Sequence, residues 1–540
     1  MKDNRKTIIM ITMLLAIVLL GIGTIAYFRR TVNGDITGQT GNLVLIVNEA
    51  NAVNNESFSV SLNRSEEEPY IMPDDKGTFD INIDSTGSST DVDVTITILR
   101  TSLPDNLKFY LDENYTQELT TKTYMLKKSD DMTMTVPVYW FWDGSVDDEN
   151  DTLFMGKTLE ANVSVSATIH APTFSETLIA NSTLDTNVNF ASTSSSTNGI
   201  GLMMRDGTQN NEYPIIYYRG KVTNNNVIFA DLCWLIVRTT ETGGIKLVFN
   251  GPIIENEDGT QSCSNYSGAG GEIANSNYTD IFVNNVKTVF NENYESPVYA
   301  GYMYNDTNKY FTGLVYSGTL DGSGYLEHLS NNEVDQATGK HVQNLTDSTI
   351  KELIDDWYEA NIKEKPEEKL LEDTVWCNDR SVISEKYSIE NKANGTYTRF
   401  YYSAYTRLDE NRSTTGVSPT LVCSRDVDKF TVDDDNGNGD LDYPIGLLTA
   451  DEINLSGGVP YRASSTYLSI SSGYFWTLSP IEFGTAGPEV SVVQNNGGIN
   501  EEPVDEDSTT VGARPSISLN NTAVISEGNG SFATPYIIEV

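Results

Sequence analysis

The segment Asp434–Asp442 has the residue types and the spacing of a calcium-binding loop. Counted from Asp434, side-chain oxygens stand at positions 1, 3 and 5, glycine at position 6 and an apolar residue at position 8. Position 12 is Ile445, which removes the usual bidentate glutamate. The candidate calcium ligands are Asp434, Asn436, Asn438, Asp440 and Asp442. A polar hairpin loop that binds no ion is the alternative interpretation.

Catalytic motifs are scarce, and we expect that the protein is not an enzyme. The chain has three histidines, none in a zinc-binding spacing: His170, His328 and His341. Ser348 and Lys351 match the SxxK pattern of serine acyl enzymes, but the companion motifs are missing. We therefore interpret Ser348 as a helix N-cap. The GxSxG, GxGxxG and Walker patterns are also absent from the sequence.

The charge of the chain limits its partners. The 540 residues include 76 Asp and Glu and 35 Lys and Arg, which gives a formal net charge of -41. Such a charge repels nucleic acid and anionic lipid headgroups and favours cations. The length predicts two or three domains, and a hydrophobic content of 38% is enough for folded cores.

The N-terminus predicts export. Lys2, Arg5 and Lys6 precede an apolar run over residues 8–28, long enough to cross a bilayer. Residues 1–34 are therefore a signal peptide, cut near Thr24-Ile25-Ala26, or an uncut signal anchor. In both cases the rest of the chain is extracellular or displayed on the cell surface, and the uncut helix would hold it in the membrane.

An exported chain with an even number of cysteines predicts disulfides. The four cysteines are Cys233, Cys263, Cys377 and Cys423, and no CxxC motif occurs. Three connectivities are open, and we favour the sequential pairs Cys233–Cys263 and Cys377–Cys423. Each bridge would add roughly 3–4 kcal/mol in the chain-entropy model.

Residues 35–190 predict a β-sandwich. Apolar and polar residues alternate with period two, as expected for half-buried antiparallel strands. The predicted strands are centred on 58–62, 79–83, 92–98, 132–138 and 163–169. The segment 191–199, rich in Ser and Thr, predicts a flexible linker to a second domain over 200–540.

The first domain resembles TasA/camelysin-like surface and biofilm-matrix proteins of Gram-positive bacteria. The resemblance covers residues 10–172 and rests on Gly23–Phe28 at the end of the apolar run and on Pro137–Trp142. It implies a jelly-roll-like sandwich whose copies join into fibres by strand exchange. The peptidase activity assigned to camelysins is not carried over, because no zinc motif is present.

The second domain predicts strands and one clear helix. Strands are expected at 215–218, 227–238 and 245–249, with a hairpin turn at Thr242-Gly243-Gly244. A helix begins after Asp347 or Ser348, since apolar residues at 350, 353, 354 and 357 share one face. The overall prediction is a mainly β protein, with the sandwich followed by an α+β domain.

The blocks Tyr443–Glu452, Tyr474–Pro480 and Gly512–Leu519 resemble the DUF6273 family of Firmicutes surface proteins. Upstream, Tyr217–Gly220, Asn225–Trp234 and Cys377–Arg380 resemble the wider group of surface proteins that carry this domain. Together the resemblance spans about residues 215–540 and implies a C-type-lectin-like fold with a binding or scaffold role. The fold is shared with formylglycine-generating enzymes, whose copper-binding cysteine pair has no counterpart here. We expect Trp476 and Arg514 to serve the core, and ligand contacts to lie in variable loops such as 488–507.

The sequence therefore predicts a bacterial surface or secreted protein that binds an extracellular ligand, either a glycan or a protein. A structural fibre subunit whose partners are like subunits is the first alternative, and an extracellular enzyme is the second. The prediction includes no nucleic-acid partner and no cofactor beyond the candidate calcium ion.

Overall fold

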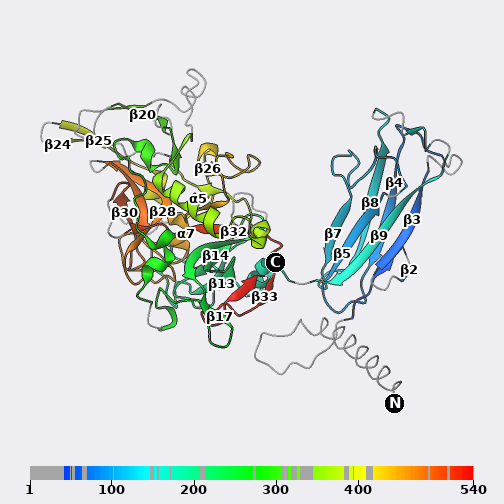
Figure 1. Ribbon diagram of the computed structural model, residues 1–540, viewed down its shortest axis with the longest axis horizontal. Coiled ribbons are helices and arrows are strands. Elements are labelled where there is room, and N and C mark those ends of the chain that lie inside the picture. Colours follow the sequence, from blue (N-terminus) through cyan, green and yellow to red (C-terminus); the bar gives the residue numbers. More distant parts are fainter. Residues whose placement is uncertain are drawn as a thin grey trace, which may run out of the picture. The chain divides into compact units, whose positions relative to one another are not determined.

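The protein is mainly β, and its chain divides into an N-terminal and a C-terminal unit (Figure 1). The computed structural model describes residues 42–538 except 49, 52–54, 64–69, 101, 146–150, 155–156, 171, 186, 206–212, 272–274, 306–309, 312–313, 318–324, 329–343, 382–387, 393–394, 409–417, 485–486 and 507–510. The division falls between Ala171 and Pro172, about twenty residues before the predicted linker.

The N-terminal unit consists of two antiparallel sheets. One sheet has the order β3-β9-β5-β7, from Asn55–Leu62, Leu159–Ile169, Val92–Leu99 and Thr121–Leu126. The other has the order β2-β1-β4-β8-β6, from Ala50–Asn51, Ile46–Val47, Lys76–Asp84, Thr133–Trp142 and Leu107–Tyr110. Alternate residues of both sheets, such as Val94 and Val138, are fully buried in one hydrophobic cluster, as the period-two pattern predicts. The jelly-roll-like topology stays a prediction.

The C-terminal unit contains a branched ten-stranded sheet. Its main path is β10-β11-β12-β14-β13-β34-β33, and β15, β32 and β27 branch from β14. These strands are Thr183–Leu184, Gly201–Arg205, Ile215–Arg219, Leu232–Thr239, Asn226–Phe229, Tyr536–Ile538, Ile525–Glu527, Ile245–Pro252, Ser516–Leu519 and Ile445–Gly446. Strand β34 pairs in parallel with β13, so residues near the end of the sequence join strands near the start of the unit.

The prediction of one strand over 227–238 is wrong, because a tight turn divides it into β13 and β14. Ala230 and Asp231, at the turn, have φ angles of 52° and 58°. Positive φ at both central residues is the geometry of a two-residue hairpin whose twist matches that of its strands. The predicted turn at 242–244 is present between β14 and β15, and Gly243 supplies its positive φ of 84°.

A second sheet of this unit has the order β24-β25-β28-β29-β30, with β31 beside β28. The strands are Ser388–Lys392, Gly395–Tyr401, Tyr474–Gly484, Gly487–Val493, Ile499–Pro503 and Val511–Gly512. The segment 488–507, expected to be a variable loop, is therefore largely the β29–β30 hairpin. Shorter strands are β16 Ile254–Glu255, β17 Gln261–Ser262, β18 Met303–Tyr304, β19 Tyr310–Phe311, β20 Leu314–Ser317, β21 Tyr325–His328, β22 Thr346–Asp347, β23 Trp376–Cys377 and β26 Lys429–Phe430.

The described helices are α3 Phe174–Ala180, α5 Thr349–Asn361, α6 Ser403–Leu408 and α7 Ala450–Leu455. The predicted helix is confirmed as α5, with Ser348 as its N-cap. Its apolar face is buried in the core of the unit, where the ring of Trp357 lies 5.0 Å from that of Phe249 and 6.1 Å from that of Trp234. Burial of this face, rather than helix propensity, stabilises α5.

The predicted flexible linker at 191–199 is instead part of the C-terminal unit. Ser194 is buried and donates from Oγ to the Ser465 carbonyl at 2.6 Å, and Thr193 Oγ1 donates to the Gly457 carbonyl at 3.1 Å. Short hydroxyl side chains form such bonds to backbone groups readily. The Ser and Thr side chains that predicted a flexible segment therefore bond it to the rest of the C-terminal unit.

The described residues contain no helix long and apolar enough to cross a membrane. The predicted export segment, residues 1–34, lies outside the described residues. Signal cleavage and membrane anchoring therefore stay predictions.

Candidate functional site

A small pocket lies where α6, β28 and β30 meet the loop that follows α7, and we call it the tyrosine pocket. It is lined by Tyr405, Leu408, Pro460, Tyr461, Ile481, Ile499, Asn500 and Glu501. Its cavity volume is about 10 Å³, roughly the room that one water molecule needs. Three of the lining residues come from the segment 488–507, where the sequence predicted ligand contacts.

Tyr461 occupies a strained backbone position in this pocket. Its φ angle is 55°, in the left-handed region that an aromatic residue rarely adopts and that costs on the order of 1 kcal/mol. Strand β30 fixes this position, because the Tyr461 amide donates to the Ile499 carbonyl at 2.8 Å and Pro460 forms a β-bridge with the same residue. The side chain remains 37% exposed, so the strain holds a ring at the surface.

Tyr405, on α6, supplies the second ring of the pocket. Its ring stacks on that of Tyr401 at the end of β25, with centroids 4.0 Å apart and planes 19° apart. Tyr401 in turn pairs with Glu482 of β28, a residue that is only 4% exposed. The stack therefore fixes the orientation of Tyr405 from the neighbouring sheet.

Glu501 is the one carboxylate among the described residues that line the pocket, and the surface open inside the cavity is apolar. Burial raises the pKa of the Tyr461 hydroxyl, and the charge of Glu501, to which that hydroxyl donates a hydrogen bond, raises it further. Burial also raises the pKa of Glu502, with a further contribution from Glu506 and Glu501. None of the described residues that line the pocket is basic.

The predicted calcium loop does not bring its carboxylates to one point. Asp440 Oδ2 accepts a hydrogen bond from Asn344 Nδ2 at 2.8 Å, and Asn438 Nδ2 donates to the Val427 carbonyl at 3.2 Å. Asp442 Oδ2 lies 3.4 Å from Lys351 Nζ. Asp434 and Asn436 are exposed. These separate contacts favour the polar-loop interpretation, and calcium binding itself stays a prediction.

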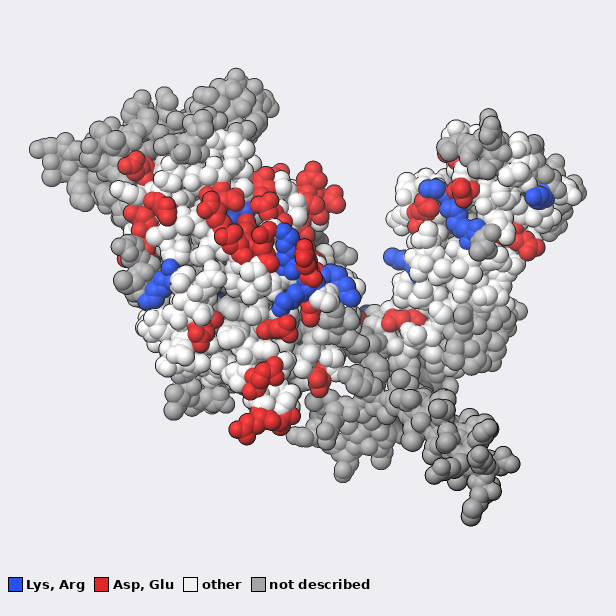
Figure 2. Space-filling model, in the orientation of Figure 1, with Lys and Arg blue, Asp and Glu red and all other residues white. Residues whose placement is uncertain are grey.

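Lys351 is the cation of a carboxylate cluster that the sequence did not predict. Oxygens of Asp347, Asp355 and Asp442 lie within 4.8 Å of one another, and the buried Lys351 Nζ lies 3.1, 2.6 and 3.4 Å from them. Burial raises the pKa of Asp355 to about 6, against the effect of Lys351. Figure 2 shows acidic side chains gathered over α5 and β26 on this face.

The SxxK pattern is a helix cap, as predicted. Ser348 Oγ donates to the Tyr302 carbonyl at 2.7 Å and accepts a hydrogen bond from the Lys351 amide. The Lys351 ammonium points to carboxylates instead of to Ser348, so it does not activate the hydroxyl as a base.

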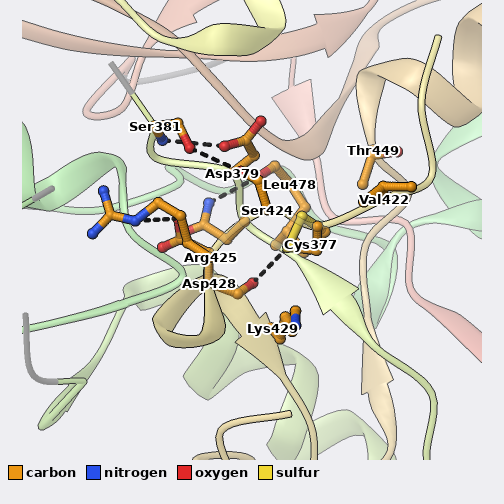
Figure 3. Close-up of a disulfide and its surroundings, with 12 residues drawn as sticks. Cys377, Asp379, Ser381, Val422, Ser424, Arg425, Asp428, Lys429, Thr449 and Leu478 are labelled. Carbon is orange, nitrogen blue, oxygen red and sulfur yellow. Dashed lines mark hydrogen bonds and ion pairs between the residues drawn. A yellow bond between two sulfur atoms is a disulfide. The ribbon is translucent and has the colours of Figure 1, made fainter. Parts of the chain in front are cut away.

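Both favoured disulfides are present, Cys233–Cys263 and Cys377–Cys423. Cys423 Sγ of the second bridge lies 3.5 Å from the backbone carbonyl of Asp428. Figure 3 shows the surroundings of this disulfide. The Asp428 side chain is fully buried and accepts from Arg380 Nε at 2.7 Å. The bridge thus anchors the β26 segment beside a buried ion pair.

A second buried charge network lies near this disulfide. Glu452 accepts from Arg238 Nε at 2.7 Å and from Lys246 Nζ at 3.1 Å, and all three side chains are nearly inaccessible. Burial would raise the pKa of Glu452, but Lys246 and Arg238 lower it to about 2. Lys246 Nζ also lies 3.9 Å from the ring centroid of Trp376. The network is internally paired, so it joins strands and does not present a charge to a ligand.

Trp476 and Arg514 are both buried, as expected for core residues. Trp476 Nε1 donates to the Thr288 carbonyl at 2.8 Å. Arg514 donates from Nε to the Phe249 carbonyl at 2.7 Å and from Nη2 to Asn250 Oδ1 at 3.1 Å. Burial lowers the pKa of Arg514 to about 9, which keeps it charged at neutral pH.

No family model, no curated protein and no solved structure matches the chain. The two family resemblances therefore stay predictions, and the chemistry of the tyrosine pocket is the basis for a functional proposal.

Proposed function

We propose that the protein recognises an extracellular ligand through the tyrosine pocket, as an adhesin or receptor at the bacterial surface. The observation that carries this proposal is Tyr461, an exposed aromatic residue in a strained conformation. Strain at a surface ring that the neighbouring strand holds in place is typical of binding sites. Aromatic residues also dominate the energetics of recognition surfaces.

The test is an array of glycans and extracellular proteins probed with the oxidised full chain, with calcium and with a chelator. The matched variant is Tyr461→Asn, because asparagine tolerates the left-handed backbone while the ring and its hydroxyl are removed. We expect reproducible binding that Tyr461→Asn abolishes and that the chelator leaves unchanged. An array without any ligand for well-folded protein would contradict the proposal.

A second candidate, a structural fibre subunit, is favoured by the edges of the four-stranded sheet in the N-terminal unit. Among the described residues, β3 pairs only with β9 and β7 pairs only with β5. Unpaired edge groups can add a strand from another copy. Polymers visible by electron microscopy, and lost when a proline replaces Ser59 in β3, would support this function.

A further inference from the structure

We propose that the N-terminal unit carries a second binding surface, which takes a neutral polysaccharide chain and is separate from the tyrosine pocket. This surface, the aromatic face, lies on the outer side of β4, β8 and β6. Its side chains are Lys76 of β4, Tyr139 and Phe141 of β8, Lys108 and Tyr110 of β6, and Tyr115 of the loop that follows β6. Along β8, Tyr139 and Phe141 alternate with buried residues such as Trp140, so they point away from the hydrophobic core.

Strand pairing arranges the aromatic face in two rows. Phe141 lies between Lys76 and Lys108 in one row, and Tyr139 lies beside Tyr110 in the next. The rings of both rows are partly exposed. The solvent side of an antiparallel sheet usually carries polar residues, so aromatic side chains gathered there indicate a binding surface.

Tyr115 lies across these rows in a strained conformation. Its φ angle is 60°, and among the described residues Tyr115 and Tyr461 are the aromatic ones with positive φ. The Tyr115 ring centroid lies 5.5 Å from that of Phe141 and 5.4 Å from that of Tyr110. The Asp112 carboxylate holds the loop by accepting hydrogen bonds from three of its backbone amides, at 3.0, 3.0 and 2.7 Å. A strained residue persists where its surroundings fix it, so the ring is in place before a ligand arrives.

Charges of both signs border the rings. Lys108 Nζ lies 2.8 Å from Glu118 Oε2, and Lys76 supplies a second ammonium group. Burial raises the pKa of the Tyr110 hydroxyl. Lys108 opposes this shift, whereas Glu118 and Asp143 add to it, so groups of both signs lie near the hydroxyl. An ionic ligand would meet a like charge here, whereas the hydroxyls of a neutral sugar donate to carboxylates and accept from ammonium groups.

The size of the aromatic face also favours a sugar chain. Neighbouring strands lie about 4.8 Å apart and the two rows about 7 Å apart, so the face measures about 10 Å by about 7 Å. A stable protein interface buries about 800 Å² on each partner, far more than this face offers. A sugar ring presents C–H groups on its faces, which pack on the electron-rich faces of aromatic rings, and hydroxyls around its rim.

The experiment is saturation-transfer NMR on the full chain with the neutral hexasaccharides cellohexaose, maltohexaose and laminarihexaose. The control probes are sorbitol, which has hydroxyls but no ring, and hexagalacturonate, whose rings carry carboxylates. We expect at least one neutral hexasaccharide to bind and neither control probe to bind. Because the ligand is uncharged, raising salt from about 20 mM to about 0.5 M should change its affinity by less than about twofold.

The variants are Tyr115→Asn, because asparagine tolerates positive φ, and Phe141→Thr, because threonine suits a strand. Each removes one ring and should weaken the hexasaccharide about fivefold. The matched control is Tyr294→Asn, at an exposed tyrosine of the C-terminal unit, and it should leave the affinity unchanged. Equal thermal unfolding midpoints confirm that the variants fold.

Absence of binding by every hexasaccharide, or binding that neither Tyr115→Asn nor Phe141→Thr weakens, would overturn this assignment. Tighter binding of hexagalacturonate than of the neutral probes would also overturn it. Tyr461→Asn distinguishes the two sites. A hexasaccharide whose binding Tyr461→Asn abolishes and Tyr115→Asn leaves unchanged supports the tyrosine pocket and overturns only the aromatic face. The opposite response supports the aromatic face, whatever the array shows for the tyrosine pocket.

Discussion

The Nζ atom of Lys351 lies 2.6 Å from Oδ2 of Asp355, one turn further along the same helix. Two more carboxylates complete the surroundings of this ammonium, which is itself inaccessible to solvent. Burial alone would lower the pKa of Lys351, but Asp355 and Asp347 raise it, so the lysine stays charged. The side chain thus holds together α5, β22 and the loop that was predicted to bind calcium.

Replacing Lys351 by methionine should convert this cluster into a cation-dependent one. Three carboxylates would then face one another without a counter-charge, at a cost of about 3 kcal/mol in the free energy of unfolding. We expect calcium to raise the melting temperature of Lys351→Met and not that of the parent protein, by calorimetry. Lys363→Met, at an exposed pair, is the control and should leave the melting temperature nearly unchanged with or without calcium. A parent protein that calcium stabilises equally would contradict this interpretation.

Removing the Cys377–Cys423 bridge should destabilise the C-terminal unit. The bridge closes a separation of 46 residues, for which chain entropy predicts a loss of about 4 kcal/mol. The double variant Cys377→Ala/Cys423→Ala should therefore unfold at lower urea concentration. Cys233→Ala/Cys263→Ala, with a separation of 30, should lose slightly less. Unchanged midpoints in both variants would show that neither bridge restrains the unfolded chain.

Glu372 should make stability fall as pH rises. Its carboxylate accepts from Thr240 and Thr242 beneath the β14–β15 turn, and burial raises its pKa to about 7. Above the ordinary pKa of glutamate, the folded state still binds a proton that the unfolded state has released. The stability that this proton contributes is complete below about pH 4.5 and is lost as the pH rises to about 7. Between about pH 5 and pH 8 the loss is about 2 kcal/mol. The free energy of unfolding in urea, measured at several pH values, should show this decrease in the parent protein and not in Glu372→Gln. An equal pH dependence in both proteins would refute the role of Glu372.

Trp476→Ala should remove a core side chain. The indole is 1% exposed, and its ring centroid lies 5.8 Å from that of Phe290. Truncation of a buried tryptophan costs about 3–5 kcal/mol, so we expect a clear drop in melting temperature. A stable variant that has lost ligand binding would instead place Trp476 in a binding site.

Local patterns predicted much of the fold. The alternation of apolar and polar residues predicted the strands around Val94 and Val138. Ser348, together with the apolar helix face that follows it, predicted the N-cap of α5. The break at Ala230 and Asp231 was missed, because Asp231 tolerates positive φ but Ala230 is not a usual residue for it, and the turn carries no glycine. The segment 191–199 was misjudged, since its partners Gly457 and Ser465 lie more than 250 residues further along the chain.

The tyrosine pocket shows the same limit. Glu501 lies in a segment that the sequence singled out, but Tyr405 and Tyr461 join it only through the pairing of β25 with β28 and the bridge at Pro460. The Lys351 cluster escaped prediction for a similar reason, because Asp442 comes from a loop about ninety residues away.

The parallel pairing of β34 with β13 has a consequence for biogenesis. Val227 lies opposite Tyr536, so this part of the sheet forms only after the chain has been synthesised beyond Tyr536. Contacts of such long sequence separation slow folding. This sheet therefore stays incomplete, with one edge of β13 unpaired, until β34 is available to it.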